Sequence, residues 1–251
     1  DAPTVTTAVK HSSEAQLLQA WQNRDEDGAE RHALQWHAEE PFSSRPIQFL
    51  TTLYSLQSEY EKSLGWVRRG LIADPNDEGL IANLAFVKAA VGDTHLAEIA
   101  INRIKDTSLA PYLKATEGLI ALKRGEFAKA ESLYREAEHT FDKLRRPDLA
   151  ALAMAYYAKF AVESDAPDSA RIRAEAEAKS TKARSIDGDL LMSRLSPSTP
   201  ALSMKDEPKR RLLQWVFDSK SNTLTERPGV TAKGAPAIVV AARKAPRPPR
   251  G

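Results

Sequence analysis

The chain has 251 residues, of which 42% are hydrophobic and 28% charged, and its formal net charge at pH 7 is only +2. So small a net charge does not favour a nucleic-acid binder, and the sequence has no apolar run long enough to span a membrane. It has no cysteine, which excludes disulfides, thiolate nucleophiles and thiolate metal ligands and fits a reducing compartment, so we expect a cytoplasmic protein.

The first 41 residues predict a flexible start followed by two helices. Residues 1–11 carry neither methionine nor a hydrophobic signal core, so we expect a flexible segment within a longer, bacterial-style protein. The stretch from Ser12 to Pro41 then predicts a helix, a turn near Gly28 and a second helix.

Three further helix pairs follow, and small residues recur at equivalent places in them. Small side chains at such positions allow two helix backbones to approach closely. Around them, apolar residues recur at spacings of three and four, which is typical of amphipathic helices. The small residues are Thr51, Ala85 and Gly118 in the first helices and Ser63, Ala97 and Ala130 in the second helices, the latter spaced 34 and then 33 residues apart.

This pattern resembles the tetratricopeptide repeat (TPR) family, whose unit is a helix–turn–helix of 34 residues. The departures from the family pattern are Ser58 for a turn glycine, Gly70 for an alanine and Lys88 for an aromatic residue. The resemblance implies an all-α, TPR-like α-solenoid. The matching residues are Thr51, Tyr54, Ser63, Val67 and Pro75; then Leu84, Ala85, Gly92, Ala97 and Ile101; then Gly118, Gly125, Ala130, Tyr134 and Ala137.

One more helix pair is predicted from Leu149 to Ala183, with its turn at residues 165–168. Residues 12–183 are therefore expected to form about four to five repeats. The second helix of the third repeat continues towards Pro147, which lengthens the repeat spacing there.

The composition changes after residue 183. Residues 184–208 predict a linker, because the stretch from Ser196 onward is rich in serine and proline. Residues 209–220 predict a possible capping helix, and residues 221–251 predict a basic, proline-rich and mostly disordered tail. Within that tail, the run AIVVAA at residues 237–242 has the composition of a strand.

No combination of residues predicts catalysis, and no glycine-rich or Walker-type nucleotide loop occurs. His32 and His37 are five residues apart, which does not place both on one helical face, so a solvated helix end is favoured over a metal site. The acidic run at residues 25–27 lacks the further ligands of a calcium loop and predicts a turn. We therefore expect a chain that is not an enzyme and that holds no cofactor or metal.

The four tryptophans have two interpretations. They could form a ligand-facing aromatic set, or they could pack between repeats, which is favoured because aromatic side chains bury large areas. They are Trp21, Trp36, Trp66 and Trp215.

The resemblance to TPR proteins also implies a partner-binding groove, because the first helices of that family line a concave face. Its apolar positions would suit a helix or an extended peptide; the alternative is that they pack against one another or against a capping helix. The exposed groove positions implied here are Gln48, Thr52, Ser55, Ala82, Phe86, Ala89, Ala115, Leu119, Leu122 and Lys159.

The sequence thus predicts a protein-interaction scaffold that binds a protein or peptide partner, with self-association possible and no membrane contact. One alternative is the regulatory or dimerising portion of a larger enzyme or signalling protein, whose catalytic or receiver domain lies N-terminal to this chain. Another is a nucleic-acid-associated module acting through the basic tail, which is disfavoured because no aromatic residues interleave with its cations.

Overall fold

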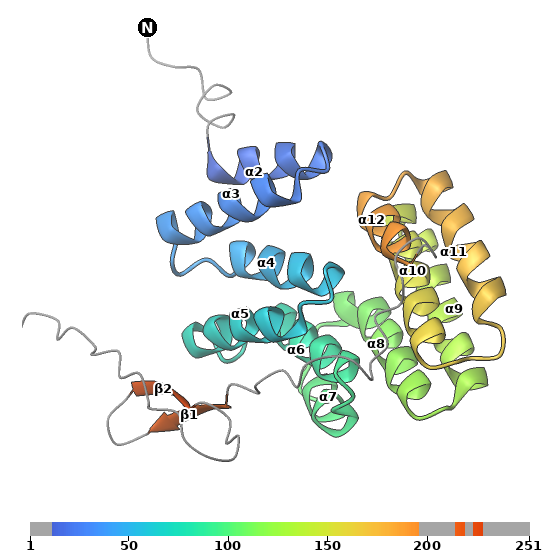
Figure 1. Cartoon of the computed structure of the whole chain (residues 1–251). Coiled ribbons are helices and arrows are strands. Elements are labelled where there is room, and N and C mark those ends of the chain that lie inside the picture. The colour runs from blue at the N-terminus through green and yellow to red at the C-terminus, as the bar shows by residue number, and fades with distance from the viewer. Residues whose placement is uncertain (1–11, 196–213, 219–222, 228–251) are drawn as a thin grey trace, which may run out of the picture. The chain divides into compact units, whose positions relative to one another are not determined.

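Figure 1 shows a computed structural model of the chain, which describes residues 12–195, 214–218 and 223–227. The chain divides into two units, Asp1–Thr199 and Pro200–Gly251. The described part of the first unit is all-helical, as predicted, and its helices pack neighbour to neighbour. They are α2 (Ser13–Gln22), α3 (Glu26–Glu39), α4 (Ser44–Leu56), α5 (Tyr60–Ala73), α6 (Glu78–Ala90), α7 (Thr94–Ile101), the short 3-10 helix η1 (Thr107–Leu109), α8 (Ala110–Lys123), α9 (Phe127–Lys143), α10 (Pro147–Glu163), α11 (Ser169–Ala183) and α12 (Ile186–Arg194).

The helices α2 to α11 form five successive hairpins, α2–α3, α4–α5, α6–α7, α8–α9 and α10–α11. In each hairpin the turn contains one residue in the left-handed conformation, with φ between 51° and 89°. The first four of these residues lie 34, 34 and 33 residues apart, which matches the repeat spacing in the sequence. The fifth lies 40 residues further on, because α9 and α10 have 17 residues each. They are Arg24, Ser58, Gly92, Gly125 and Asp165.

The turn of the first hairpin differs from the prediction. It lies before Glu26 rather than near Gly28, which belongs to the first turn of α3. The reason is a helix cap: the side chain of Asp25 accepts a hydrogen bond from the backbone N–H of Gly28 at 2.8 Å. The side chains of Asp77 and Asp93 cap α6 and α7 in the same way.

The small residues lie where the two helices of a hairpin meet, as predicted. Ser63 is fully buried, and its hydroxyl donates a hydrogen bond of 3.0 Å to the carbonyl oxygen of Thr51. A Cβ atom added to Gly118 would lie 2.7 Å from the ring of Tyr134 on the facing helix. These contacts show why the positions tolerate only small side chains.

The helix α12 corrects the prediction that residues 184–208 form a linker. The hydroxyl of Ser185 accepts a hydrogen bond from the backbone N–H of Gly188, which caps this helix. Leu191 and Met192 then bury their side chains in the core. A helix thus does close the row of hairpins. It is α12, directly after α11, and not the predicted capping helix at residues 209–220.

The described part of the second unit is an antiparallel pair of strands, β1 (Gln214–Asp218) and β2 (Thr223–Arg227). The prediction of a helix over residues 209–220 is wrong for residues 214–218. Trp215, Val216 and Phe217 are aromatic or β-branched residues that favour strands, and Phe217 lies opposite Leu224 in the register. The segment at residues 223–227, expected within a disordered tail, is the partner strand. Residues 1–11 and the AIVVAA run at residues 237–242 lie outside the described residues.

Candidate interaction surfaces

The predicted groove positions lie on the first helices of the hairpins, but most of them are not exposed. Gln48, Thr52, Phe86 and Ala115 keep partial exposure. The expectation of exposure is wrong for the other six positions. The first helices of successive hairpins, α4, α6, α8 and α10, which we call the inner helices and whose facing sides form the inner face, pack against one another, and α4 and α10 also contact α12. The six buried residues are Ser55, Ala82, Ala89, Leu119, Leu122 and Lys159.

Aromatic and aliphatic side chains fill the space between the inner helices. The ring of Phe86 on α6 packs edge-on against Tyr156 on α10, with ring centroids 4.8 Å apart. Leu119 and Leu122 are at most 2% exposed and belong to the same core as Leu191 of α12. The inner face is thus a hydrophobic core in this structure, which is the packing alternative considered for these residues.

Lys159 shows how a charged residue can lie within that core. Its ammonium group pairs with the carboxylate of Glu163 one turn later, and it lies 5.4 Å from the centroid of the Phe160 ring. The side chain is 8% exposed, so the ion pair and the ring together replace most of its water. A groove ligand would therefore have to displace an existing partner to reach this lysine.

Three polar contacts join the first hairpin to α12, and we call them the seam. The indole N–H of Trp21 donates to the carboxylate of Asp187 at 2.9 Å, and Arg24 pairs with Asp189 at 2.7 Å. Arg194 pairs with Glu26 at 2.7 Å. The contacts join residues 165 to 168 positions apart, so the row curves until its last helix reaches its first hairpin, as can be followed from α2 to α12 in Figure 1.

The seam contains one carboxyl group with a perturbed titration. Burial raises the pKa of Asp187 above its ordinary value, and the negative charge of Asp148 acts in the same direction. The hydrogen bond from Trp21 opposes this shift because it stabilises the carboxylate. Trp21 therefore has a structural partner, consistent with the packing interpretation of the tryptophans. Its partner, α12, had a sequence signal in Ser185 followed by two aspartates in the first turn.

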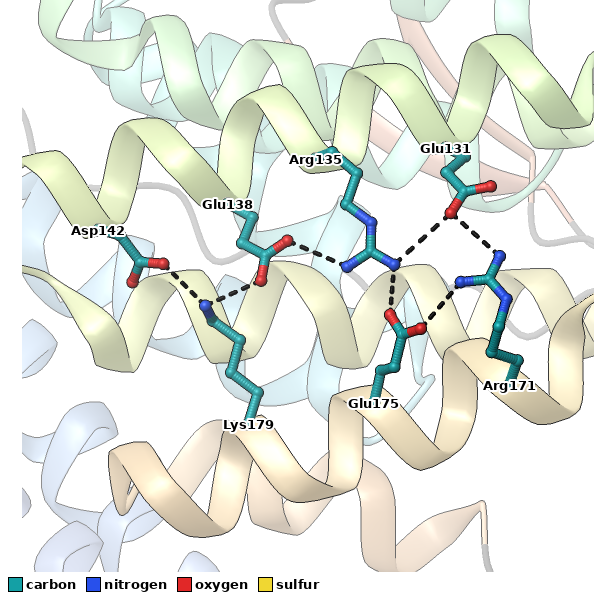
Figure 2. A network of polar contacts seen from close by, with 7 residues as sticks. All are labelled: Glu131, Arg135, Glu138, Asp142, Arg171, Glu175 and Lys179. Carbon is teal, nitrogen blue, oxygen red and sulfur yellow. Dashed lines mark hydrogen bonds and ion pairs between the residues drawn. The ribbon is translucent and has the colours of Figure 1, made fainter.

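An ion-pair network joins α9 to α11, as Figure 2 shows. Arg171 pairs with Glu131 at 3.0 Å, and Lys179 pairs with Asp142 at 2.8 Å. Between them Arg135 contacts Glu175. Because residues 131 to 142 face residues 171 to 179 in the same order, the two helices run parallel and in a defined register.

The hairpins have two different edges. The turns inside the hairpins lie along one edge, and the connections between successive hairpins lie along the other, which we call the connection edge. It comprises these connections and the adjoining helix ends, residues 39–43, 72–78, 102–109, 143–148 and 182–185.

Several contacts join neighbouring connections along this edge. The carboxylate of Glu78 accepts hydrogen bonds from the backbone N–H groups of Lys105 and Asp106, at 2.8 and 2.6 Å. Further along, the hydroxyl of Ser185 donates to the carbonyl oxygen of Asp148 at 3.1 Å.

The most exposed large apolar side chains of the described residues lie on the connection edge. Phe42 is 95% exposed, Ile72 is 68% exposed and Leu144 is 59% exposed. No groove argument from the sequence identified them, although a phenylalanine directly after Pro41 in a short connection is a visible signal. They lie in or beside three different connections, so the feature repeats along the edge.

His37, one of the two histidines considered as metal ligands, packs against an aromatic ring. His37 contacts the ring of Trp66 edge-on, with centroids 5.2 Å apart. Burial lowers the pKa of His37, and the nearby charge of Arg69 lowers it further. Within the described residues no three histidine, aspartate or glutamate side chains are grouped so that they could hold a metal ion.

No family model, no curated protein and no solved structure matches this chain. Among the described residues, none of the helices has both the length and the apolar character needed to cross a membrane.

Proposed function

We propose that this chain is a protein-interaction scaffold of TPR-like helical hairpins that binds its partners along the connection edge. The observation that carries the proposal is the position of Phe42, Ile72 and Leu144, the three most exposed large apolar side chains of the described residues. Burying one such side chain on binding is worth about 1.5–3 kcal/mol. Three of them on one edge provide the apolar centre that protein interfaces require.

The inner face is a less favourable binding site for a partner than the connection edge. A partner helix in the groove would have to replace the contacts that Phe86 makes with Tyr156 and that Leu119 makes in the core. A partner that binds the connection edge contacts side chains that are already exposed. In this proposal the chain contributes rigid presentation of a surface and carries out no covalent chemistry.

The test compares a variant of the edge with a variant of the opposite edge. The first variant replaces Phe42, Ile72 and Leu144 by serine. The matched control replaces Val91 and Val162 by serine, because these valines are 47% and 42% exposed and lie at the turns inside the hairpins. All three proteins are tagged, expressed in the native host and purified with their bound proteins, which are quantified by mass spectrometry.

We expect the edge variant to lose proteins that the wild type and the control retain, with unchanged helical circular dichroism in all three. Equal sets of bound proteins in the edge variant and the wild type would overturn the proposed surface.

A further inference from the structure

The connection edge carries a second feature besides its apolar side chains, which is an uneven distribution of charge. The connections that follow the first two hairpins are acidic, and those that follow the last two are basic; between them, residues 102–109 carry Arg103, Lys105 and Asp106. The acidic half contains Glu39, Glu40, Asp74, Asp77 and Glu78. The basic half contains Lys143, Arg145, Arg146, Lys182 and Arg184.

The basic half is brought together by the register of α9 and α11. The pairing of Lys179 with Asp142 in Figure 2 places the ends of these two parallel helices side by side. Lys143 and Lys182, which lie in the last turns of α9 and α11 just beyond this contact, are therefore on the same edge. The contact of Ser185 with the carbonyl oxygen of Asp148 holds the two connections together.

Most cations of this half have no partner. Arg146 pairs with Asp148 at 2.8 Å. In contrast, no carboxylate of the described residues pairs with Lys143, Arg145, Lys182 or Arg184. Their charge is thus directed to solvent at the ends of two helices, beside the exposed side chain of Leu144.

The acidic half is assembled in a similar way. The amide of Gln48 at the start of α4 donates to Asp77 at 3.5 Å, so the α3–α4 and α5–α6 connections are neighbours. In the described part of the chain no cationic side chain pairs with Glu39, Glu40 or Asp74. Two cations do lie nearby. They are Lys105, whose backbone N–H donates to Glu78, and Arg103, whose guanidinium donates to the carbonyl oxygen of Pro75 at 3.0 Å.

We propose that the connection edge binds the connection edge of a second copy of this chain in an antiparallel, two-fold symmetric dimer. This inference rests on the proposed function and names its partner. A two-fold axis places the acidic half of each copy against the basic half of the other, so every attractive contact occurs twice. In the same arrangement Phe42 and Ile72 of one copy approach Leu144 of its partner and leave water.

A second copy is favoured over another protein because one surface carries both complementary charges. A different partner would need a matching basic and acidic patch in the reverse order, whereas a second copy has it by symmetry. Complementary charges also set the direction of docking, because the parallel arrangement would bring like charges together.

The experiment measures the mass of the full chain by sedimentation equilibrium over a concentration series. One variant combines Lys143→Glu with Lys182→Glu, which reverses two of the five charges of the basic half. A second combines Glu40→Lys with Asp74→Lys, which reverses two of the five charges of the acidic half. The control combines Arg31→Glu with Arg68→Glu, which removes two exposed cations without a carboxylate partner in the described residues, outside the connection edge.

We expect the wild type and the control to dimerise, and each edge variant alone to dimerise at least tenfold more weakly. Mixing the two edge variants should give a dimer of one copy of each that is stronger than the dimer of either variant alone, because an unaltered acidic half then meets an unaltered basic half and the reversed charges face one another. Raising the salt to about 1 M NaCl, where charges are screened within about 3 Å, should weaken the wild-type dimer.

A monomeric wild type, or a dimer that neither edge variant weakens, overturns the proposed self-association. The proposed function is tested apart from it by the serine variant of the edge. If the wild type is monomeric but that variant still loses bound proteins, the edge binds other proteins and only the self-association is wrong.

Discussion

Two glycines in the middle of helices, Gly65 and Gly118, allow one chemical change to be tested in two environments. Replacing a glycine by alanine inside a helix stabilises the helix by about 1 kcal/mol. Apart from the backbone of its own helix and its two chain neighbours, no atom lies within 4 Å of a Cβ atom added to Gly65. We therefore expect Gly65→Ala to stabilise the protein by about 1 kcal/mol.

At Gly118 the same Cβ atom would lie 2.7 and 2.9 Å from two ring atoms of Tyr134. Favourable carbon–carbon contacts need about 3.5–4.0 Å. The ring cannot move freely, because Tyr134 is 1% exposed and stacks on Tyr157 with centroids 4.6 Å apart. Overpacking of this kind costs about 1–3 kcal/mol. After the helix gain is subtracted, Gly118→Ala is expected to be destabilising by about 0–2 kcal/mol, or about 1–3 kcal/mol less stable than Gly65→Ala.

The measurement is urea unfolding and thermal unfolding of the two variants and the wild type, both followed by circular dichroism at the helical band. A difference of this size separates the thermal midpoints of the two variants by several degrees, since about 1 kcal/mol shifts the midpoint of such a unit by about 2–4 °C. If Gly118→Ala stabilises the protein as much as Gly65→Ala, the close approach of α8 and α9 is refuted.

Four further variants, one of them a surface control, test the last helix, the seam and the ion-pair network. Leu191→Ala should lower the free energy of unfolding by about 2–5 kcal/mol in urea unfolding, because the side chain is 1% exposed, whereas Leu144→Ala on the surface should change it by less than about 0.5 kcal/mol. Asp187→Asn keeps an acceptor for Trp21 but removes a buried charge. Since the folded-state pKa of Asp187 is raised, ionisation costs stability above that pKa. The cost shrinks as the pH falls below it and disappears below the ordinary pKa of an aspartate. The variant should therefore have a higher thermal midpoint than the wild type at neutral pH, and an advantage that persists unchanged in acid would contradict this. Arg135→Gln should destabilise the protein by about 1 kcal/mol, and by less at high salt in the same urea assay, because the network is partly exposed.

Much of the local structure could be predicted from the sequence. The recurrence of Ser63, Ala97 and Ala130 identified the second helices of three hairpins, and all three residues are fully buried. The apolar spacing identified the helix pairs because a helix turns once every 3.6 residues, so the residues on its buried face recur with that period. The helix α12 was missed because its segment is short and is followed by a serine- and proline-rich stretch, so the change in composition at Ser196 outweighed the cap at Ser185.

The predicted site failed for a different reason. Leu119 and Phe86 were assigned to an exposed groove by their register in the repeat, and the register says which face of a helix a residue occupies. It does not say how strongly successive hairpins rotate, and that rotation decides whether the inner faces meet. The exposure of Phe42 was equally invisible to the repeat pattern, since it lies between two repeats.

The sequence by itself thus determined the helices, their pairing into hairpins and the small residues at their contacts, because these depend on residues fewer than about 40 positions apart. The tertiary structure alone decided that the row closes. That closure depends on the contact of Trp21 with Asp187, which are 166 positions apart, and on the sum of many small rotations between hairpins. The filling of the inner face follows from that curvature, which no local pattern encodes.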